Sequence, residues 1–167
     1  MTLSEPGRAW TFGDDVDTDQ ITPSRFIVSS DPEELAERAF NDLRPEFSAN
    51  VREGEFVVAG ENFGGGSSRE HAPLSLLGAG VDVVVAQSFA RIFFRNAINI
   101  GLPVLICPEA DRIDDGDEIS VDLDVGTVTN HTTDERYDAE PLPAFLQELV
   151  DAGGLKVYTR RKLKSET

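Results

Sequence analysis

The stretch that decides the fold reads Gly60-Glu61-Asn62-Phe63-Gly64-Gly65-Gly66-Ser67-Ser68-Arg69-Glu70-His71. The apolar run from Phe56 to Ala59 leads into it, so the pattern predicts a strand, a tight glycine loop and a helix start. Consecutive glycines allow positive φ angles and let a ligand come close to the backbone. Amides at a helix N-terminus attract negative charge. The stretch therefore predicts a cradle for a carboxylate or a phosphate.

The same residues also fit an ordinary helix start. Ser67 to Glu70 match a capping box, in which a serine hydroxyl caps a backbone amide and a glutamate three residues later reaches back. Pro73 restricts both interpretations, because a helix that began at Ser67 would meet this proline after its first turn. We expect the helix either to begin nearer His71 or to carry an early kink, and cap and anion site stay open as alternatives.

Three other ligand-binding loops are excluded by spacing. A P-loop needs a lysine after its last glycine, but Gly66 is followed by two serines, and a dinucleotide fingerprint needs glycine where Arg69 stands. Four aspartates lie between residues 14 and 19, yet the glycine and glutamate positions of a calcium-binding EF-hand loop are not filled. A solvated turn with Asx-type caps is the favoured interpretation of this acidic segment.

The composition limits the domain count and the classes of partner that can be expected. The 167 residues suggest one domain, residues 1–167, whose last residues, 160–167, are expected to be a frayed tail. With 31 acids against 15 bases the net charge is −16, which repels nucleic acid and anionic membranes, so neither is an expected partner. Arginine supplies nearly all the bases, and an acidic surface adapted to high salt is one hypothesis for this imbalance.

Cysteine and histidine are too few for a metal centre. Cys107 is the only cysteine, so this chain alone forms no internal disulfide and no cysteine-ligated iron–sulfur or zinc site. His71 and His131 are not spaced to make a metal cluster with it. The first residues lack a signal-peptide pattern and no apolar run reaches membrane-spanning length, so we expect a cytoplasmic protein.

The order of the predicted elements indicates an α/β fold. Before the glycine loop we expect a strand at 9–12, an extended run at 25–30, and a helix capped by Ser30 or Asp31 and ended by Pro45. After it we expect helices at 73–77 and 88–98 and strands at 81–86 and 102–107, which makes a parallel βαβαβ core. The remaining chain predicts a hairpin of 118–123 with 127–131, a helix at 143–150, and a last strand at 155–158. Residues 109–140 hold twelve acids and two bases, which suggests an exposed β layer added to the core.

Two segments carry a resemblance to a known family. Residues 60–72 and 87–101 resemble the small subunit of 3-isopropylmalate dehydratase, which is similar to the swivelling domain of aconitase. The aspartate motif from Asp17 to Pro23 fits as well, so the similarity runs from about Gly13 to Leu105. Gly65 departs from the pattern, since relatives often carry cysteine there. The resemblance implies a swivelling β/β/α domain of three layers.

The resemblance also implies a reaction and a partner. It implies the isomerisation of 2-isopropylmalate and 3-isopropylmalate, through 2-isopropylmaleate, by dehydration and rehydration in leucine biosynthesis. The implied partner is a large subunit with a [4Fe-4S] cluster that binds the departing hydroxyl, in a heterodimer or heterotetramer. No cofactor is expected on this chain.

Roles follow by position in the motifs. Ser67 would be the general base that takes a proton next to a carboxylate, and it would need nearby cationic groups and amides to become basic enough. Arg69 would clamp a substrate carboxylate, with Ser68 and the backbone at Gly66 as further donors. Asp19 matches a family site aspartate, and orientation of Arg69 is one hypothesis for its role.

Val28 bears on the choice of substrate. In relatives that act on longer tricarboxylic acids an arginine follows the aromatic-aliphatic pair, whereas here Val28 follows Phe26 and Ile27. An apolar residue suits an isopropyl group and cannot compensate the desolvation of a third carboxylate. The alternatives are the small subunit of homoaconitase or of a methylated-malate hydratase and, from another class, a non-catalytic anion-binding regulatory module.

Overall fold

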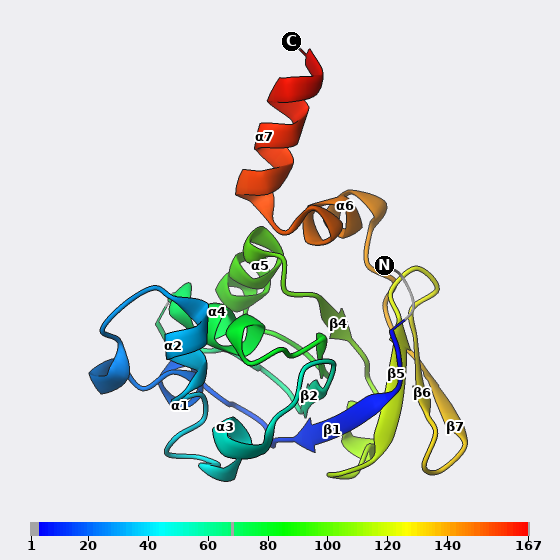
Figure 1. The fold of residues 1–167 in the computed structure, drawn as a ribbon. Coiled ribbons are helices and arrows are strands. Elements are labelled where there is room, and N and C mark those ends of the chain that lie inside the picture. The colour runs from blue at the N-terminus through cyan, green and yellow to red at the C-terminus, as the bar shows by residue number, and fades with distance from the viewer. Residues whose placement is uncertain (1–3, 68, 167) are drawn as a thin grey trace.

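The parallel strands of the fold continue into an antiparallel layer. Within residues 4–67 and 69–166, which this computed structural model describes, seven strands form one sheet in the order β4-β3-β2-β1-β5-β6-β7 (Figure 1). The parallel part consists of β1 (Gly7–Thr11), β2 (Phe56–Ala59), β3 (Val83–Ala86) and β4 (Val104–Ile106). The antiparallel part consists of β5 (Glu118–Asp122), β6 (Thr127–Asn130) and β7 (Glu135–Asp138), and it joins the rest where β5 pairs with β1.

The central strands are buried on both faces because helices cover one face and the antiparallel strands cover the other. Side chains of β2 alternate between two cores: Val57 and Ala59 pack in the core under the helices, whereas Phe56 and Val58 face the core that β5 to β7 close. β3 alternates in the same way. This arrangement confirms the predicted parallel βαβαβ core with an added β layer.

The helices differ in length, and their bounds are these: α1 (Thr18–Ile21), η1 (Ser24–Phe26), α2 (Pro32–Ala36), α3 (Glu46–Asn50), α4 (His71–Gly78), α5 (Arg91–Ile100), η2 (Ala110–Arg112), α6 (Ala144–Ala152) and α7 (Leu155–Glu166). Asp31 caps α2, since its carboxylate accepts a hydrogen bond from the Glu33 amide. Gly101, with φ 89°, ends α5. The cap of α2 at Asp31 and the end of α5 at Gly101 were both predicted. None of the helices in the described part of the chain has the length and apolarity that a membrane span needs.

Three local predictions are wrong. The run at 25–30 is not extended but forms the 3₁₀ turn η1 and a loop, because Phe26 and Ile27 donate back to the carbonyls of Pro23 and Ser24. The helix after Asp31 does not continue to Pro45: α2 ends at Ala36, turns follow, and α3 begins at Glu46. The strand at 155–158 is instead the first turn of α7.

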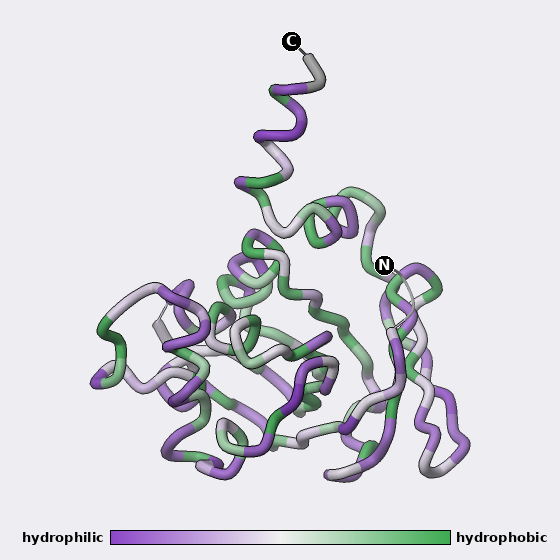
Figure 2. Tube along the Cα trace, in the orientation of Figure 1, coloured by the Kyte–Doolittle hydropathy of each residue, from purple (hydrophilic) through white to green (hydrophobic). Residues whose placement is uncertain are grey.

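Helix α7 leaves the body of the molecule, with its outer turns mostly hydrophilic (Figures 1 and 2). Its first turn is held by Tyr158, whose ring contacts Phe145 at a centroid distance of 5.8 Å. The β-branched and aromatic residues at 157–159 suggested a strand, but the described sheet has no strand beside them, and the arginines and lysines that follow favour helix. Residues 160–166, predicted as a tail, continue this helix.

The glycine loop packs tightly on α5. Gly64 has φ 88°, and a Cβ atom built on it would lie 2.3 Å from Cγ of Phe93, whose ring is buried. Glycine is required there for two reasons, the backbone conformation and the close approach. At Gly65 the nearest atoms to the same construction belong to the Asn62 side chain, with its Nδ2 atom at 3.3 Å.

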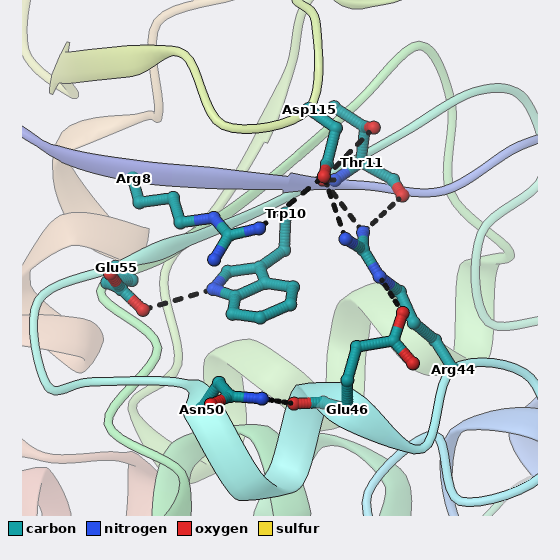
Figure 3. A network of polar contacts seen from close by, with 8 residues as sticks. All are labelled: Arg8, Trp10, Thr11, Arg44, Glu46, Asn50, Glu55 and Asp115. Carbon is teal, nitrogen blue, oxygen red and sulfur yellow. Dashed lines mark hydrogen bonds and ion pairs between the residues drawn. The ribbon is translucent and has the colours of Figure 1, made fainter.

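A polar network ties the N-terminal segment to the antiparallel layer (Figure 3). Arg44 donates from Nη1 and Nη2 to the two carboxylate oxygens of Asp115, each at 2.7 Å, and from Nη1 to the Thr11 carbonyl at 3.2 Å. The indole of Trp10 lies between the guanidinium groups of Arg8 and Arg44, at 3.7 and 4.7 Å from its ring centroid. Hydrogen bonds from Arg44 hold the pKa of Asp115 well below its usual range.

Replacing Asp115 by asparagine should lower the free energy of unfolding by about 1–2 kcal/mol near neutral pH, a figure reduced because this ion pair is partly exposed. Since the folded pKa is depressed, the contribution is complete above the unfolded value of about 3.9 and is lost as the pH falls through the folded value. Urea unfolding from pH 7 to pH 2 checks this. The exposed Glu109, paired with Arg112 at 3.2 Å, offers Glu109→Gln as a control. A difference between wild type and Asp115→Asn that stays constant with pH would contradict the assignment.

Gly64→Ala should destabilise the fold by about 2–4 kcal/mol through overpacking and a left-handed backbone. Gly65→Ala should stay within about 0.5 kcal/mol, because the nearest atom is the end of a side chain that can move. Thermal unfolding of both variants measures the contrast. Equal midpoints would show that the loop does not depend on its contact with Phe93.

Candidate active site

The glycine loop is held in place by residues 14–18. Asp14 accepts a hydrogen bond from the Glu61 amide at 2.8 Å. Further along, Gly64 donates to the Val16 carbonyl at 2.7 Å and Thr18 donates to the Gly65 carbonyl at 2.8 Å. Within the acidic segment Asp17 caps α1, since its carboxylate accepts a hydrogen bond from the Gln20 amide at 2.8 Å, and this is a cap of the predicted kind. Asp14 also holds the loop that follows β2.

Thr18 positions Ser67 directly. The Thr18 hydroxyl, which is 2% exposed, donates to the Ser67 carbonyl at 3.0 Å and lies 3.2 Å from Ser67 Oγ. Ser67 itself is exposed. A threonine hydroxyl has a single proton, so while Thr18 donates to the carbonyl, the Ser67 hydroxyl is the donor in the contact between the two oxygens. If Ser67 lost its proton, Thr18 could turn its own proton toward Ser67 Oγ.

The end of the loop offers free donors beside Ser67. The amides of Gly66 and Ser67 make no hydrogen bond within the part of the chain that the structure describes. Gly66 has φ 91°, a conformation that disfavours any larger residue. Helix α4 begins at His71, with Glu70 at the N-cap and no side-chain cap, so the capping-box interpretation of Ser67 to Glu70 is wrong and the helix starts late rather than kinked.

Arg69 and Asp19 come together across the loop. Nη1 of Arg69 lies 3.5 Å from Oδ1 of Asp19 and 3.5 Å from the Thr22 carbonyl. Nε and Nη2 make no hydrogen bond with the described residues, which leaves one side of the guanidinium fork for an anion. The pKa of Asp19 is lowered, first by a hydrogen bond from the Ser24 amide and also by the charge of Arg69. Asp19 is therefore a carboxylate that links Arg69 to the start of η1.

The segment that carries Val28 follows η1 and is anchored by Phe26. The guanidinium groups of Arg25 and Arg38 lie 4.5 and 4.9 Å from the Phe26 ring centroid, and Arg25 pairs with Asp42. The Val28 side chain is 85% exposed. Ser68, the other predicted side-chain donor, lies outside the described residues.

The described residues do not fit an iron–sulfur cluster. Cys107 is fully buried, and burial raises the pKa of its thiol, whereas a metal ligand needs an accessible thiolate. Among residues 4–67 and 69–166 no three acidic, cysteine or histidine side chains are grouped to hold a metal ion. His71 instead lies 3.4 Å from the Ser30 hydroxyl.

One positioning residue was missed in the sequence. In the sequence Thr18 is recognisable only as part of the aspartate motif, because its contact with Ser67 joins residues 49 positions apart. The one sequence feature that could have indicated its role is a hydroxyl residue between two aspartates. This pattern is common in turns, so it does not indicate a positioning role without the fold.

Comparison with known proteins gives consistent matches. Residues 46–109 match the family model described as the aconitase C-terminal domain. The chain is 60% identical over 160 residues to the 3-isopropylmalate dehydratase small subunit of Methanosarcina mazei, with 96% of this chain and 98% of that protein covered. It is 54% identical over 168 residues to the protein of the same name from Aquifex aeolicus, with 99% and 100% covered.

A solved structure agrees over the whole length. The crystal structure of 3-isopropylmalate dehydratase from Methanocaldococcus jannaschii superposes with a TM-score of 0.92 at 42% sequence identity, covering 98% of both chains. Because identity and coverage are high in both kinds of comparison, the chain belongs to the family of 3-isopropylmalate dehydratase small subunits, with the aconitase-type swivel fold.

Proposed function

We propose that this chain, together with a large iron–sulfur subunit, isomerises 2-isopropylmalate and 3-isopropylmalate through 2-isopropylmaleate in leucine biosynthesis. The observation that carries the proposal is the exposed Ser67 hydroxyl, held 3.2 Å from the buried Thr18 hydroxyl at the end of a glycine loop. The name of the relatives, small subunit, supports the existence of a large partner.

Removal of a carbon-bound proton is the task assigned to Ser67. A free hydroxyl is too weak a base for this step, so its alkoxide needs stabilisation. The Thr18 hydroxyl, 3.2 Å from Ser67 Oγ, can donate to this alkoxide, and the amides of Gly66 and Ser67, which have no partner among the described residues, are available to an anion at the loop end. Ser67 takes the proton next to a carboxylate during dehydration and returns it when water adds to the alkene.

Substrate binding is assigned to the free side of Arg69. Two parallel hydrogen bonds from a guanidinium fork suit a carboxylate, and Asp19 holds the other side of the fork. Asp19 is thus proposed to orient Arg69 and to fix the segment after Ser24 relative to it. Gly66 and Ser68 are proposed as further backbone and hydroxyl donors.

The [4Fe-4S] cluster is proposed to lie on the large subunit, where it acts as the Lewis acid for the departing hydroxyl. The single cysteine of this chain is buried, which agrees with binding of the cluster by the other subunit. The part of this chain is to bind the carboxylate end of the substrate and to move the proton at Ser67.

Ser67→Ala should lower turnover of the assembled enzyme by about 10²–10⁴-fold, the usual contribution of a general base. Association with the large subunit should not change, since only one exposed hydroxyl is removed. Ser48→Ala, on α3, is the matched control and should leave turnover unchanged. Full activity of Ser67→Ala would end the proposal.

Val28→Arg should move substrate preference away from 2-isopropylmalate and toward homoaconitate by about 10–200-fold in the ratio of kcat/KM values, because the new charge can pair with a third carboxylate. The control is Val125→Arg, another exposed valine, at the turn between β5 and β6. An unchanged ratio in Val28→Arg would remove residue 28 from the specificity argument.

A further inference from the structure

Positive charge is concentrated on two adjoining helices of this acidic protein. Helices α5 and α7 together carry seven of the 15 bases and a single acid, Glu166. Residues 109–140, which include the antiparallel strands β5 to β7, carry twelve acids and two bases. A positively charged surface is unusual in a chain of net charge −16. The chemistry proposed for Ser67 and Arg69 does not use the bases of α5 and α7.

A groove runs between these two helices. It has a volume of about 430 Å³ and is lined by Ile100, Leu155 and Val157, with Lys156 and Arg160 among the lining residues. Neither Lys156 nor Arg160 forms an ion pair with a described residue. The groove thus combines apolar area with two cations, Lys156 and Arg160, that have no ion-pair partner among the described residues.

The groove continues to the active-site loop. Glu70, which follows Arg69 and precedes α4, lines it together with Asn96 and Asn99 of α5. On the same side, Phe93 of α5 supports Gly64 of the loop. A protein that reaches Ser67 from this direction would cover the groove as well.

The outer part of α7 is mostly exposed to solvent, with Lys162 placed 5.7 Å from the Tyr158 ring centroid. Residues 159–164 are exposed, and Leu163 is 59% exposed. Figure 1 shows that α7 projects from the body of the molecule. Twelve-residue helices are marginal in water when they do not pack against other structure. The outer turns are therefore expected to gain packing in an assembly.

We propose that the basic face, formed by α5, α7 and the groove between them, is a docking surface for the large subunit, and that it binds an acidic surface bearing apolar side chains. This inference rests on the proposed function, because the partner must approach the exposed Ser67 beside this face. Charge complementarity favours an acidic partner surface, and it acts mainly on the association rate.

The test compares two double charge reversals with equal change in net charge. Lys156→Glu with Arg160→Glu alters the groove, whereas Arg52→Glu with Arg136→Glu alters exposed arginines outside the face. The Kd for the cognate large subunit is measured by anaerobic biolayer interferometry, and turnover is measured at saturating large subunit. We expect at least a tenfold rise in Kd for the groove variant, under a twofold rise for the control, and saturated turnover within twofold of wild type in both.

Salt gives a second readout, and its first part uses only the wild-type pair. Between about 0.1 and about 1 M KCl, screening should weaken association of the wild-type pair, and the salt dependence should be smaller for the groove variant. A Kd that is insensitive both to salt and to the groove variant, in a pair that is active, overturns the inference and leaves the proposed function standing. Absence of hydratase activity in the wild-type pair would instead refute the proposed function.

A second copy of this chain is the competing occupant, since residues 109–140 are acidic. Sedimentation of the chain alone, with and without the groove reversal, distinguishes the two. Self-association that the groove variant abolishes would assign the face to a homo-oligomer and overturn the inference. A monomer in both cases supports it.

Discussion

The structure depends on a short parallel pairing between two loops that are far apart in the sequence. The amide of Gly64 donates to Val16, the amide of Thr18 donates to Gly65, and Asp14 holds the amide of Glu61. On the opposite side the loop rests on Phe93, at a distance that only glycine allows. Between these two supports the chain has little freedom, so Ser67 reaches the surface in a defined position.

The residues that stabilise the fold are different from those that are proposed to bind the substrate. The buried cores on both faces of β2 and β3 hold the strand ends in place, and the network around Arg44 and Asp115 joins the N-terminal segment to the antiparallel layer. At the loop end the amides of Gly66 and Ser67 and one side of Arg69 have no partner among the described residues, so they are available to water or to an anion. Such unsatisfied donors at the surface fit the binding of a carboxylate.

Much of the fold could be predicted from the sequence because hydrophobic periodicity is local. The strand at 56–59, the helix that Gly101 ends and the hairpin of β5 with β6 each follow from residues within a few positions. The misses have different causes. The turn at Ser24 to Phe26 is made by short-range hydrogen bonds that the hydrophobic pattern does not indicate. Helix α7 forms where no strand of the described sheet is available for pairing, and the contact of Thr18 with Ser67 depends on the fold itself. The capping box failed because Pro73 tolerates only a later start.

Thr18 holds the Ser67 hydroxyl in place, and we propose that it donates a hydrogen bond to the Ser67 alkoxide when this forms. The most direct measurement compares kcat of the assembled enzyme for Thr18→Val, which keeps the shape and removes the hydroxyl, with Thr18→Ser, which keeps the hydroxyl. The account predicts that Thr18→Val lowers kcat by about 10-fold or more while Thr18→Ser retains most of it, as expected for loss of a hydrogen bond to a charged group. Equal kcat values for Thr18→Val and wild type, with both variants folded, would contradict it.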